Sequence, residues 1–273
     1  IGEEIDPVAS KRIRTDLYVD DGASGGTRQE VKRFVGKKDK KGKYNGSLQK
    51  IFEKGGFSIK CFVWSGCKDE EAISLMGSSV LGSKWDAKSD IMAVKFKVNL
   101  SKKRRKIAQY PDLTIHDIHK LKTIKLTKRN LLGVRAGIFD PLGIAVPFTI
   151  KLNIGIKQLF DIDKNLEWDE EIPEDFVNWW VDVMTEAIKA EILKFPRGTK
   201  PKYAVGSPIL VGFCDGSLSA YAACVYIRWE KTKAEQDGNS FDVNLLCAKD
   251  RVSPVNGCTT PKSEFNGAAL LTR

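Results

Sequence analysis

The segment LVGFCDGSLSAYAACVYIR, Leu210 to Arg228, places two apolar runs on either side of a short polar turn. Each run is rich in β-branched and aromatic residues and has the length of a strand. Three runs of this kind occur in this part of the chain: Ile209–Cys214, Ala220–Trp229 and Phe241–Ala248. They predict a three-stranded sheet, and the residues from Lys262 onward predict the opening of a helix after it.

Asp215 ends the first of these runs and is followed directly by Gly216. Taken alone, an Asp-Gly pair at this position fits an ordinary strand-end turn and a functional carboxylate equally well. The functional interpretation has a chemical basis, because carboxylate oxygens suit a hard divalent cation. The local pattern leaves both interpretations open.

Helical patterns precede the predicted sheet. Two helices, Leu126–Gly137 and Pro147–Phe160, are expected on either side of a break at Asp140–Gly143. A longer amphipathic helix is expected at Pro173–Phe195, and Pro196–Pro208 has the Pro/Gly-rich composition of a linker. The long helix carries a stripe that we expect to face the core, made of Phe176, Trp179, Trp180, Val183, Ile188 and Ile192.

The first hundred residues mix strand and helix patterns. The predicted strands are Ile13–Val19, Phe57–Trp64, and a pair, Val80–Trp85 and Ile91–Val98, around a turn at Ala87–Asp90. The predicted helices are Arg28–Val35, which stops at Gly36, and one that runs through Lys54 with Ser47 as its N-cap. Together with the second half, these patterns predict an α+β fold.

The net charge of +10 is unevenly distributed. The segment from Lys95 to Arg135 holds 13 Lys or Arg residues against two Asp, and Lys32 to Lys43 holds seven against one. By contrast, Asp161 to Glu191 carries 11 acidic residues against two Lys. Clustering of this kind favours a polyanionic partner for the first half over an ordinary solvated surface.

Composition also excludes several classes of protein. With 273 residues, 42% of them hydrophobic, the chain has room for two or three folded domains. Apolar runs such as Leu142–Phe148 are too short to cross a bilayer, and we expect neither a membrane segment nor a secretory signal. Six cysteines without a C-x-x-C pair, together with two histidines, argue against a zinc site and favour a reducing compartment.

Asp20 and Asp21 form a second carboxylate motif at the end of an apolar run, in YVDDG (Tyr18–Gly22). An Asp-Gly pair is a common hairpin signal, so a surface turn is the simpler interpretation. Two adjacent carboxylates at a strand tip also suit a divalent cation. The motif alone favours the turn.

Five motifs occur in the order found in one family: YVDD, KGGFSIK (Lys54–Lys60), VLGSKWD (Val80–Asp86), LTKRNLLGVRAGIFDPLGIAVPFTIK (Leu126–Lys151) and LVGFCDGSLSAYAACVYIR. Over nearly the whole chain they resemble the Pol polyprotein of BEL/Pao-class long-terminal-repeat retrotransposons, and the FDPLG block is the most specific to that class. The resemblance implies a reverse-transcriptase palm remnant in residues 1–100, a mostly helical thumb and connection in 101–200, and the start of a ribonuclease H-like sheet in 201–273.

The same resemblance implies a polymerase site at YVDD that uses two Mg²⁺ or Mn²⁺ ions, with Asp20 as the main ligand and Asp21 in support. It also implies contacts with the primer and pyrophosphate: Tyr18 and Val19 beside the primer end, Lys60 as a proton donor, and Leu81 and Gly82 in a primer-gripping hairpin.

The last segment resembles the beginning of ribonuclease H, in which Asp215 and Glu264, from TTPKSEFNGAALL, would hold metal ions for RNA cleavage. The basic span before it falls where the thumb would contact phosphates without regard to sequence. Its expected contact residues are Lys102, Lys103, Arg104, Arg105, Lys106, Lys128 and Arg129. The SKKRRK run also has the composition of a nuclear localisation signal.

The family takes further metal-binding carboxylates from upstream of YVDD and downstream of Glu264, so we expect a middle slice of a polyprotein that is inactive alone. The expected partners are an RNA–DNA hybrid or DNA duplex and the rest of Pol, without a membrane, in a cytoplasmic particle or the nucleus. The alternative is a non-enzymatic nucleic-acid-binding protein from a decayed or host-adopted element. An aspartic peptidase, another label for this region, is excluded because neither Asp-Thr-Gly nor Asp-Ser-Gly occurs.

Overall fold

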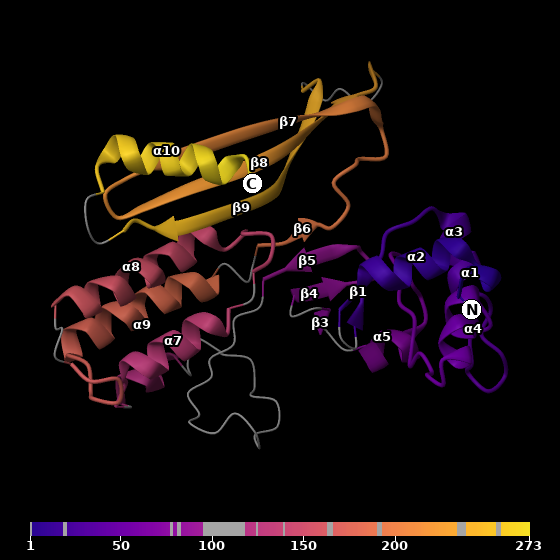
Figure 1. The fold of residues 1–273 in the computed structure, drawn as a ribbon, viewed down its shortest axis with the longest axis horizontal. Coiled ribbons are helices and arrows are strands. Elements are labelled where there is room, and N and C mark those ends of the chain that lie inside the picture. The colour runs from indigo at the N-terminus through magenta and orange to yellow at the C-terminus, as the bar shows by residue number, and fades with distance from the viewer. Residues whose placement is uncertain are drawn as a thin grey trace. The chain divides into compact units, whose positions relative to one another are not determined.

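The computed structural model describes residues 2–18, 21–76, 79–80, 83–94, 118–123, 125–138, 140–162, 166–189, 193–233, 239–254 and 258–273. The chain forms two compact units, Ile1–Ile91 and Met92–Arg273 (Figure 1). Both units contain helices and antiparallel strands, which confirms the predicted α+β class.

The first unit is built from short elements. Its helices are α1 (Gly2–Ile5), α2 (Pro7–Asp16), α3 (Arg28–Val35), α4 (Ser47–Lys54) and α5 (Glu70–Met76). Its strands are β1 (Leu17–Tyr18), β2 (Asp21–Gly22), β3 (Ser79–Val80) and β4 (Ser83–Asp86), and β5 (Ile91–Ala93) crosses the boundary between the units. β1 pairs with β2, and β3, β4 and β5 are neighbours in a second small sheet.

Local capping explains where α3 and α4 begin and end, and both helices are confirmed. The Glu30 N–H donates to Thr27 Oγ1 at 3.2 Å, and the Thr27 N–H donates to the Glu30 carboxylate at 2.7 Å, which completes a capping box. Gly36 ends α3 with a φ of +73°, a backbone conformation that glycine adopts at low cost. The N-cap of α4 is Gly46 rather than the predicted Ser47, whose buried hydroxyl faces the Arg33 carbonyl instead.

The strand predicted at Ile13–Val19 is wrong over most of its length, because helix α2 continues to Asp16 and the strand is limited to Leu17–Tyr18. The N-cap of α2 stabilises the helix: the Asp6 carboxylate accepts hydrogen bonds from the N–H groups of Val8 and Ala9, both at 3.1 Å. Burial raises the pKa of Asp6, but these hydrogen bonds, together with Ser47 and Arg33, outweigh burial and hold that pKa below its ordinary value. Asp6 is therefore charged and stabilises the helix start at neutral pH.

The strand predicted at Phe57–Trp64 is also wrong, since these residues form no ladder with another strand. Side-chain packing holds the segment instead: the rings of Phe62 and Tyr44 meet edge to face with centroids 5.1 Å apart. The neighbouring pair is confirmed at β4 and β5, on either side of the predicted turn at residues 87–90. Residues 81–82 and 95–98 of that pair lie outside the described part of the chain.

The second unit begins with a helical layer. Its elements are the 3-10 helix η1 (Lys120–Thr123), α7 (Lys128–Ala136), α8 (Val146–Ile162), α9 (Glu174–Lys189) and the short β6 (Phe195–Pro196). The three predicted helices are confirmed, but the third was predicted too long: α9 is Glu174–Lys189, residues 193–194 have no helix or strand, and Phe195 belongs to β6. Among the described residues, no helix is long and apolar enough to cross a membrane.

One apolar cluster holds the helical layer together. Trp180 of α9 and Leu152 of α8 are completely buried, as are most of their apolar neighbours in η1 and α7. Four residues of the predicted stripe on α9 pack into this cluster, namely Phe176, Trp180, Val183 and Ile188. Trp179 is not part of the cluster, and Ile192 lies outside the described residues. Trp179 remains 37% exposed, yet its ring lies so close to Gly155 of α8 that a Cβ there would come within 2.2 Å of it. A larger residue at position 155 would therefore displace the Trp179 ring from α8.

The sheet of the second unit follows the predicted order. β7 (Ala204–Gly216), β8 (Ala220–Lys231) and β9 (Phe241–Val252) form an antiparallel meander, and α10 (Thr260–Leu271) packs on β7 and β8 (Figure 1). The linker predicted at Pro196–Pro208 is too long, because β7 begins at Ala204. A shift of register between Val205 and Ile209 accommodates Gly206 and Pro208 inside the strand.

The break at Asp140–Gly143 joins the helical layer to the sheet. The Asp140 carboxylate accepts hydrogen bonds from the N–H groups of Ile144 and Ala145 at 3.0 and 2.6 Å, and so fixes the turn that precedes α8. The Ala248 N–H of β9 donates to the carbonyl of Leu142 at 2.8 Å. At Gly143 a Cβ would lie 1.8 Å from the Ala248 oxygen. The Asp-Pro-Leu-Gly sequence is therefore a turn shaped to fit the backbone of β9.

We predict that Gly143→Ala destabilises the second unit by about 2 kcal/mol or more, because the residue has a φ of +75° and no room for a side chain. Gly206→Ala is the matched control, since Gly206 has a φ of +68° but nothing within 4 Å of a Cβ. It should cost only the backbone strain, about 1–2 kcal/mol. Thermal and urea unfolding of the two variants would test this, and equal losses would contradict the close contact with β9.

Candidate functional site

Asp215 lies one residue before the end of β7 and its side chain is exposed. Its Oδ1 accepts a hydrogen bond from the Gly216 N–H at 2.8 Å, which holds the carboxylate close to the strand end. The chain then turns through residues 217–219 into β8, and the Ser217 N–H donates to the carbonyl of Ala220 at 2.8 Å. Asp215 thus combines the strand-end turn expected from its sequence with an accessible carboxylate.

Helix α10 lies directly against this strand end. A Cβ at Gly216 would come within 2.3 Å of the carbonyl carbon of Ser263 and 2.4 Å of the nitrogen of Glu264. A Cβ at Gly267 would come within 2.9 Å of the backbone carbonyl oxygen of Asp215. The backbones of β7 and α10 are therefore in contact, and this contact brings the positions of Asp215 and Glu264 together.

Buried serine hydroxyls fix the start of α10. Ser263 is fully buried, and its Oγ lies 3.1 Å from the Oγ of Ser253, just after β9. Ser253 also donates its hydroxyl to the Ser217 carbonyl at 3.0 Å and its N–H to the Ser219 carbonyl at 2.9 Å. The β7–β8 turn, the end of β9 and the first turn of α10 are thereby joined around Glu264, whose own side chain is exposed.

Two exposed carboxylates on adjacent elements are hard oxygen ligands, the type that Mg²⁺ and Mn²⁺ prefer. Their chemistry therefore fits a divalent cation. Across the described ranges, no three Asp, Glu, His or Cys side chains are grouped closely enough to hold a metal. Asp215 and Glu264 thus form a pair of candidate ligands.

The predicted polymerase residues of the first unit are only partly described. Tyr18 of β1 is paired in antiparallel register with Asp21 of β2. Val19 and Asp20 lie outside the described residues, as do Leu81 and Gly82. Lys60 is exposed in a segment without helix or strand. The predicted phosphate contacts of residues 102–106 also fall outside the described part.

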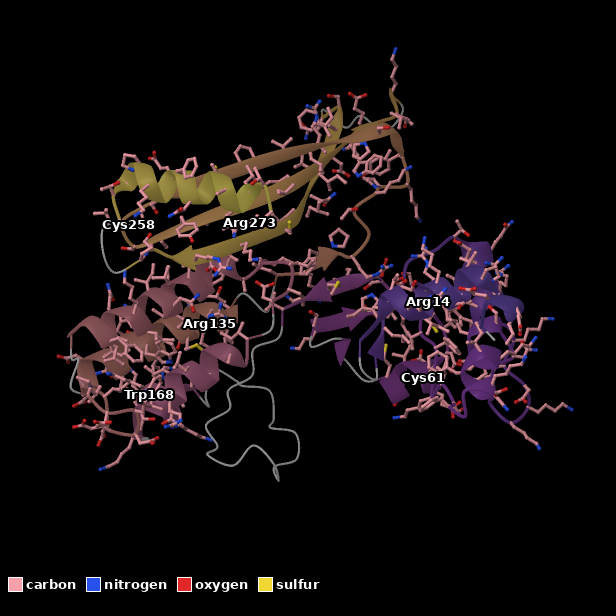
Figure 2. All side chains as sticks on the ribbon, in the orientation of Figure 1. Arg14, Cys61, Arg135, Trp168, Cys258 and Arg273 are labelled. Atoms are coloured by element: carbon pink, nitrogen blue, oxygen red, sulfur yellow. The ribbon has the colours of Figure 1, made fainter. Side chains whose placement is uncertain are left out.

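The side chains of Lys128 and Arg129 both form polar contacts with other residues of the chain. Lys128 is 3% exposed; its ammonium donates to the Leu166 carbonyl at 2.8 Å and lies 4.5 Å from the centre of the Phe160 ring. Arg129 forms two hydrogen bonds to the Asp169 carboxylate, at 2.9 and 3.2 Å, beside Trp168, which is labelled in Figure 2. Both cations therefore interact with the segment after α8.

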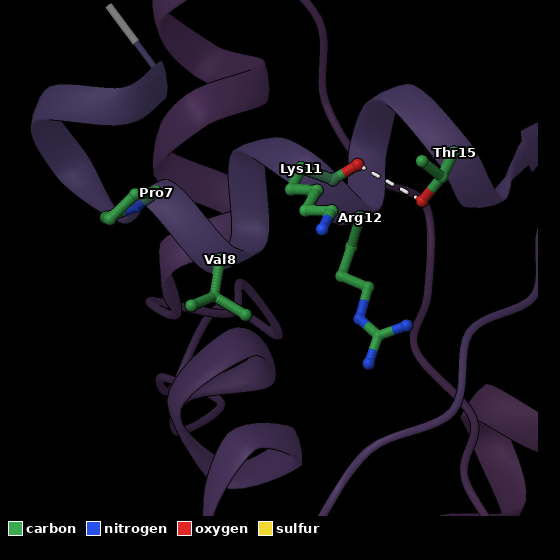
Figure 3. Close-up of a pocket in the computed structure, with 5 residues that line it drawn as sticks. All are labelled: Pro7, Val8, Lys11, Arg12 and Thr15. Carbon is green, nitrogen blue, oxygen red and sulfur yellow. Dashed lines mark hydrogen bonds between the residues drawn. The ribbon is translucent and has the colours of Figure 1, made fainter.

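A shallow hollow of about 420 Å³ lies on one face of α2 (Figure 3). Lys11 and Arg12 line it, but Arg12 forms an ion pair with Asp16 at 3.5 Å, and the Thr15 hydroxyl donates to the Lys11 carbonyl at 3.2 Å. All the residues that line this hollow come from a single helix. It does not include either predicted carboxylate pair.

Sequence reasoning missed the residues that position the carboxylate pair: Gly216, Ser253, Ser263 and Gly267. Ser263 and Gly267 are both buried and lie four residues apart, hence on one face of α10. Small residues with this spacing in a helix next to a strand-end Asp-Gly pair are the signal that would have found them.

Comparison with known proteins supports this description of the second unit. A scan against protein families matches residues 127–273 to the Pao retrotransposon-like RNaseH-like domain. The match covers more than half of the chain, and the chain belongs to this family. The matched range begins at the N-cap of α7 and includes α8, α9, the sheet and α10. Searches of curated proteins and of solved structures return no match.

We predict that Gly216→Ala displaces the start of α10 from β7 and costs about 2 kcal/mol or more, because the new methyl group would overlap backbone atoms rather than a movable side chain. Amide hydrogen exchange should then quicken in α10 more than in α8 or α9. Gly206→Ala, in the same strand, should leave α10 unchanged. Protection of α10 that is equal in the variant and the wild type would contradict the backbone contact.

Proposed function

We propose that the chain is part of a retrotransposon Pol polyprotein and that its second unit contributes to a ribonuclease H that cleaves the RNA strand of an RNA–DNA hybrid. The observation that carries the proposal is the backbone contact between β7 and α10, which brings Asp215 and Glu264 together in a chain of the Pao RNaseH-like family. Asp215 comes from a strand end and Glu264 from the first turns of a helix. Both carboxylates are exposed to an approaching substrate.

In the proposed site, Asp215 and Glu264 hold Mg²⁺ or Mn²⁺. When bound, two such ions activate the attacking water and stabilise the leaving oxygen of phosphoryl transfer. Gly216 and Gly267 allow the two backbones to approach, and the Ser253–Ser263 hydrogen bond fixes the helix start. These residues act by positioning, and positioning alone contributes about 7–11 kcal/mol to such reactions when it is complete.

For the rest of the chain we propose the parts of a reverse transcriptase: palm in 1–100, thumb and connection in 101–200, ribonuclease H in 201–273. Asp20 and Asp21 would bind metal, and the basic span from Lys95 to Arg135 would follow the phosphates of the duplex. The remaining proposed contacts are Tyr18, Val19, Lys60, Leu81 and Gly82. The partners would be an RNA–DNA hybrid or DNA duplex and other parts of Pol, in a cytoplasmic particle or the nucleus.

The 273-residue chain alone is proposed to be inactive in both reactions. Two cations held close together repel each other strongly, and a pair of carboxylates offsets that repulsion less than a complete ligand set does. A longer Pol segment that contains the chain should show both activities. If that segment binds nucleic acid but carries out neither reaction, the alternative of a non-enzymatic nucleic-acid-binding protein gains support.

In such a segment, Asp215→Asn and Glu264→Gln should each reduce hybrid cleavage by on the order of 100-fold or more while primer extension continues. Asp20→Asn should do the reverse, because each substitution removes one metal ligand from one site only. Labelled hybrid and primer–template substrates with magnesium would measure both reactions. Glu230→Gln, an exposed carboxylate change on β8, is the matched control and should alter neither.

Full hybrid cleavage by both Asp215→Asn and Glu264→Gln would overturn the assignment of the ribonuclease site. Primer extension by the 273-residue chain alone that Asp20→Asn abolishes would instead overturn the proposed inactivity of the isolated chain, because it would show that the isolated polymerase site is sufficient.

A further inference from the structure

A compact basic hairpin projects from the first unit between α3 and α4. Lys38 and Tyr44 form an antiparallel bridge at its base, and the Asp39 N–H donates to the Lys43 carbonyl at 2.8 Å. Gly42 closes the tip with a φ of +80°. We call residues 37–44 the basic hairpin; five of them are lysines and one is acidic.

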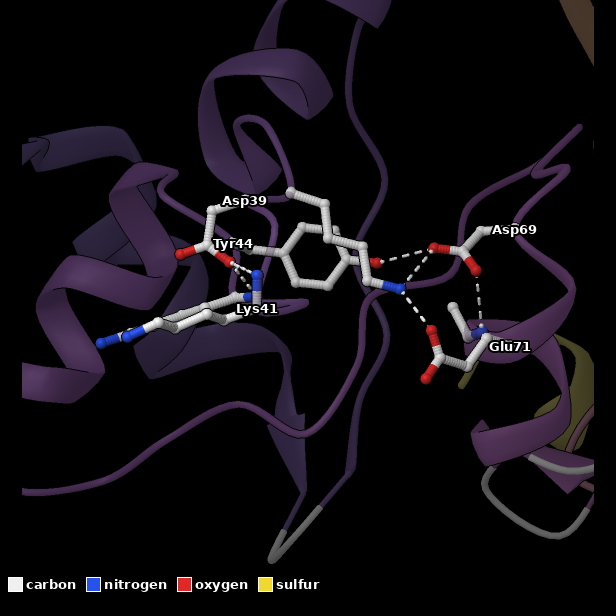
Figure 4. Close-up of polar contacts among 8 residues, drawn as sticks. Asp39, Lys41, Tyr44, Asp69 and Glu71 are labelled. Carbon is white, nitrogen blue, oxygen red and sulfur yellow. Dashed lines mark hydrogen bonds and ion pairs between the residues drawn. The ribbon is translucent and has the colours of Figure 1, made fainter.

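Side-chain contacts anchor the base of the basic hairpin to the rest of the unit. The Lys38 ammonium donates to Glu71 at 2.8 Å and to Asp69 at 3.1 Å, and these hydrogen bonds raise its pKa above the ordinary value (Figure 4). The Tyr44 hydroxyl donates to the same Asp69 carboxylate at 3.3 Å. Lys43 forms an ion pair with Glu53 of α4 at 2.7 Å. These contacts hold the base in place and use two of the five lysines.

The only acidic residue of the basic hairpin is used to form its turn. Asp39 Oδ1 accepts hydrogen bonds from the Lys41 N–H at 2.8 Å and the Lys43 N–H at 2.9 Å. In Figure 4, Asp39 and Lys41 lie on the other side of the Tyr44 ring from Asp69 and Glu71. The Asp39 carboxylate therefore faces the backbone of the turn and does not form an ion pair with a neighbouring lysine.

Three lysines of the basic hairpin remain without a counter-charge. Lys37, Lys40 and Lys41 are exposed, and no acidic side chain of the described residues pairs with them. Adjacent like charges on a short turn repel each other and cost stability unless a polyanion neutralises them. Lys38 and Lys43 thus anchor the basic hairpin, whereas, within the described part of the chain, Lys40 and Lys41 at its tip and Lys37 next to its base are unpaired.

We propose that the tip of the basic hairpin, with Lys40 and Lys41 as the contact residues, binds the phosphate backbone of a nucleic-acid duplex. This inference rests on the proposed nucleic-acid role of the chain and adds a contact surface outside the metal sites. Lysine ammonium groups act as point charges on phosphates, so the contact should be indifferent to base sequence. Release of condensed counterions should provide most of its free energy.

The test uses the full chain, a mixed-sequence DNA duplex and binding measured over a series of salt concentrations. Lys40→Gln combined with Lys41→Gln should lower the slope of log K against log salt by about 1.8, since each phosphate contact contributes about 0.9. Lys50→Gln combined with Lys54→Gln removes the same charge from α4 and should leave the slope unchanged. Equal slopes for the tip variant and the wild type, or equal losses in the two double variants, would overturn the proposal.

Two substitutions of Asp39 distinguish the effect of the hairpin's shape on binding from the effect of its charge. Asp39→Asn keeps an acceptor for the turn and should bind the duplex at least as tightly as the wild type. Asp39→Ala removes the same negative charge but also the turn's hydrogen bonds, and should bind more weakly. Binding by Asp39→Ala that is as tight as that by Asp39→Asn would show that the shape of the turn has no role and would contradict a contact made by the folded tip.

The remaining outcomes separate this surface from the proposed function. If the wild-type chain fails to bind the duplex at all, the nucleic-acid role and this proposal fail together. If it binds and the tip variant is unaffected, only this proposal fails. If vesicles of phosphatidylcholine and phosphatidylserine bind as tightly as the duplex and lose binding equally in the tip variant, the surface recognises anionic membranes instead.

Discussion

The close approach of two backbones, β7 and α10, is the constraint on which the candidate site depends. Gly216 and Gly267 supply the space, and any side chain at either position would overlap atoms of the opposite backbone. Because the contact is between main chains, it fixes the positions of Asp215 and Glu264 without using their carboxylates. Both side chains therefore remain available for a ligand.

A close backbone contact at a glycine also joins the sheet to the helical layer. Gly143 fits against the Ala248 carbonyl of β9, and the Asp-Pro-Leu-Gly turn that contains it leads into α8. An electrostatic interaction accompanies this junction: burial raises the pKa of the Asp250 carboxyl, and the charge of Arg135 on α7 partly offsets that rise. The helical layer and the sheet thus form one unit, and the family match spans both.

Sequence pattern predicted the elements whose signals are local. The strands β7 to β9 and the helices α3, α7 and α8 follow from apolar periodicity, glycine and capping residues near each element. The strand predicted at Ile13–Asp16 is wrong because Asp6 and Pro7, six or more residues earlier, start a helix that continues through a β-rich run. The burial of Lys128 depends on Phe160 and Leu166, and the division of lysines in the basic hairpin depends on Glu53, Asp69 and Glu71. Partners that are this distant in the sequence cannot be predicted from the local pattern. Asp215 and Glu264 were predicted from the family resemblance instead.

If β7 and α10 hold Asp215 and Glu264 together as ligands for one metal site, Mn²⁺ added to the full chain should broaden the backbone amide signals of the residues around that site. Broadening should be strongest at the amides of Gly216 and Glu264, and Asp215→Asn should abolish it there while the fold is retained. Broadening that is centred on other parts of the chain, or that persists at Gly216 and Glu264 in Asp215→Asn, would contradict a metal site shared by the two carboxylates.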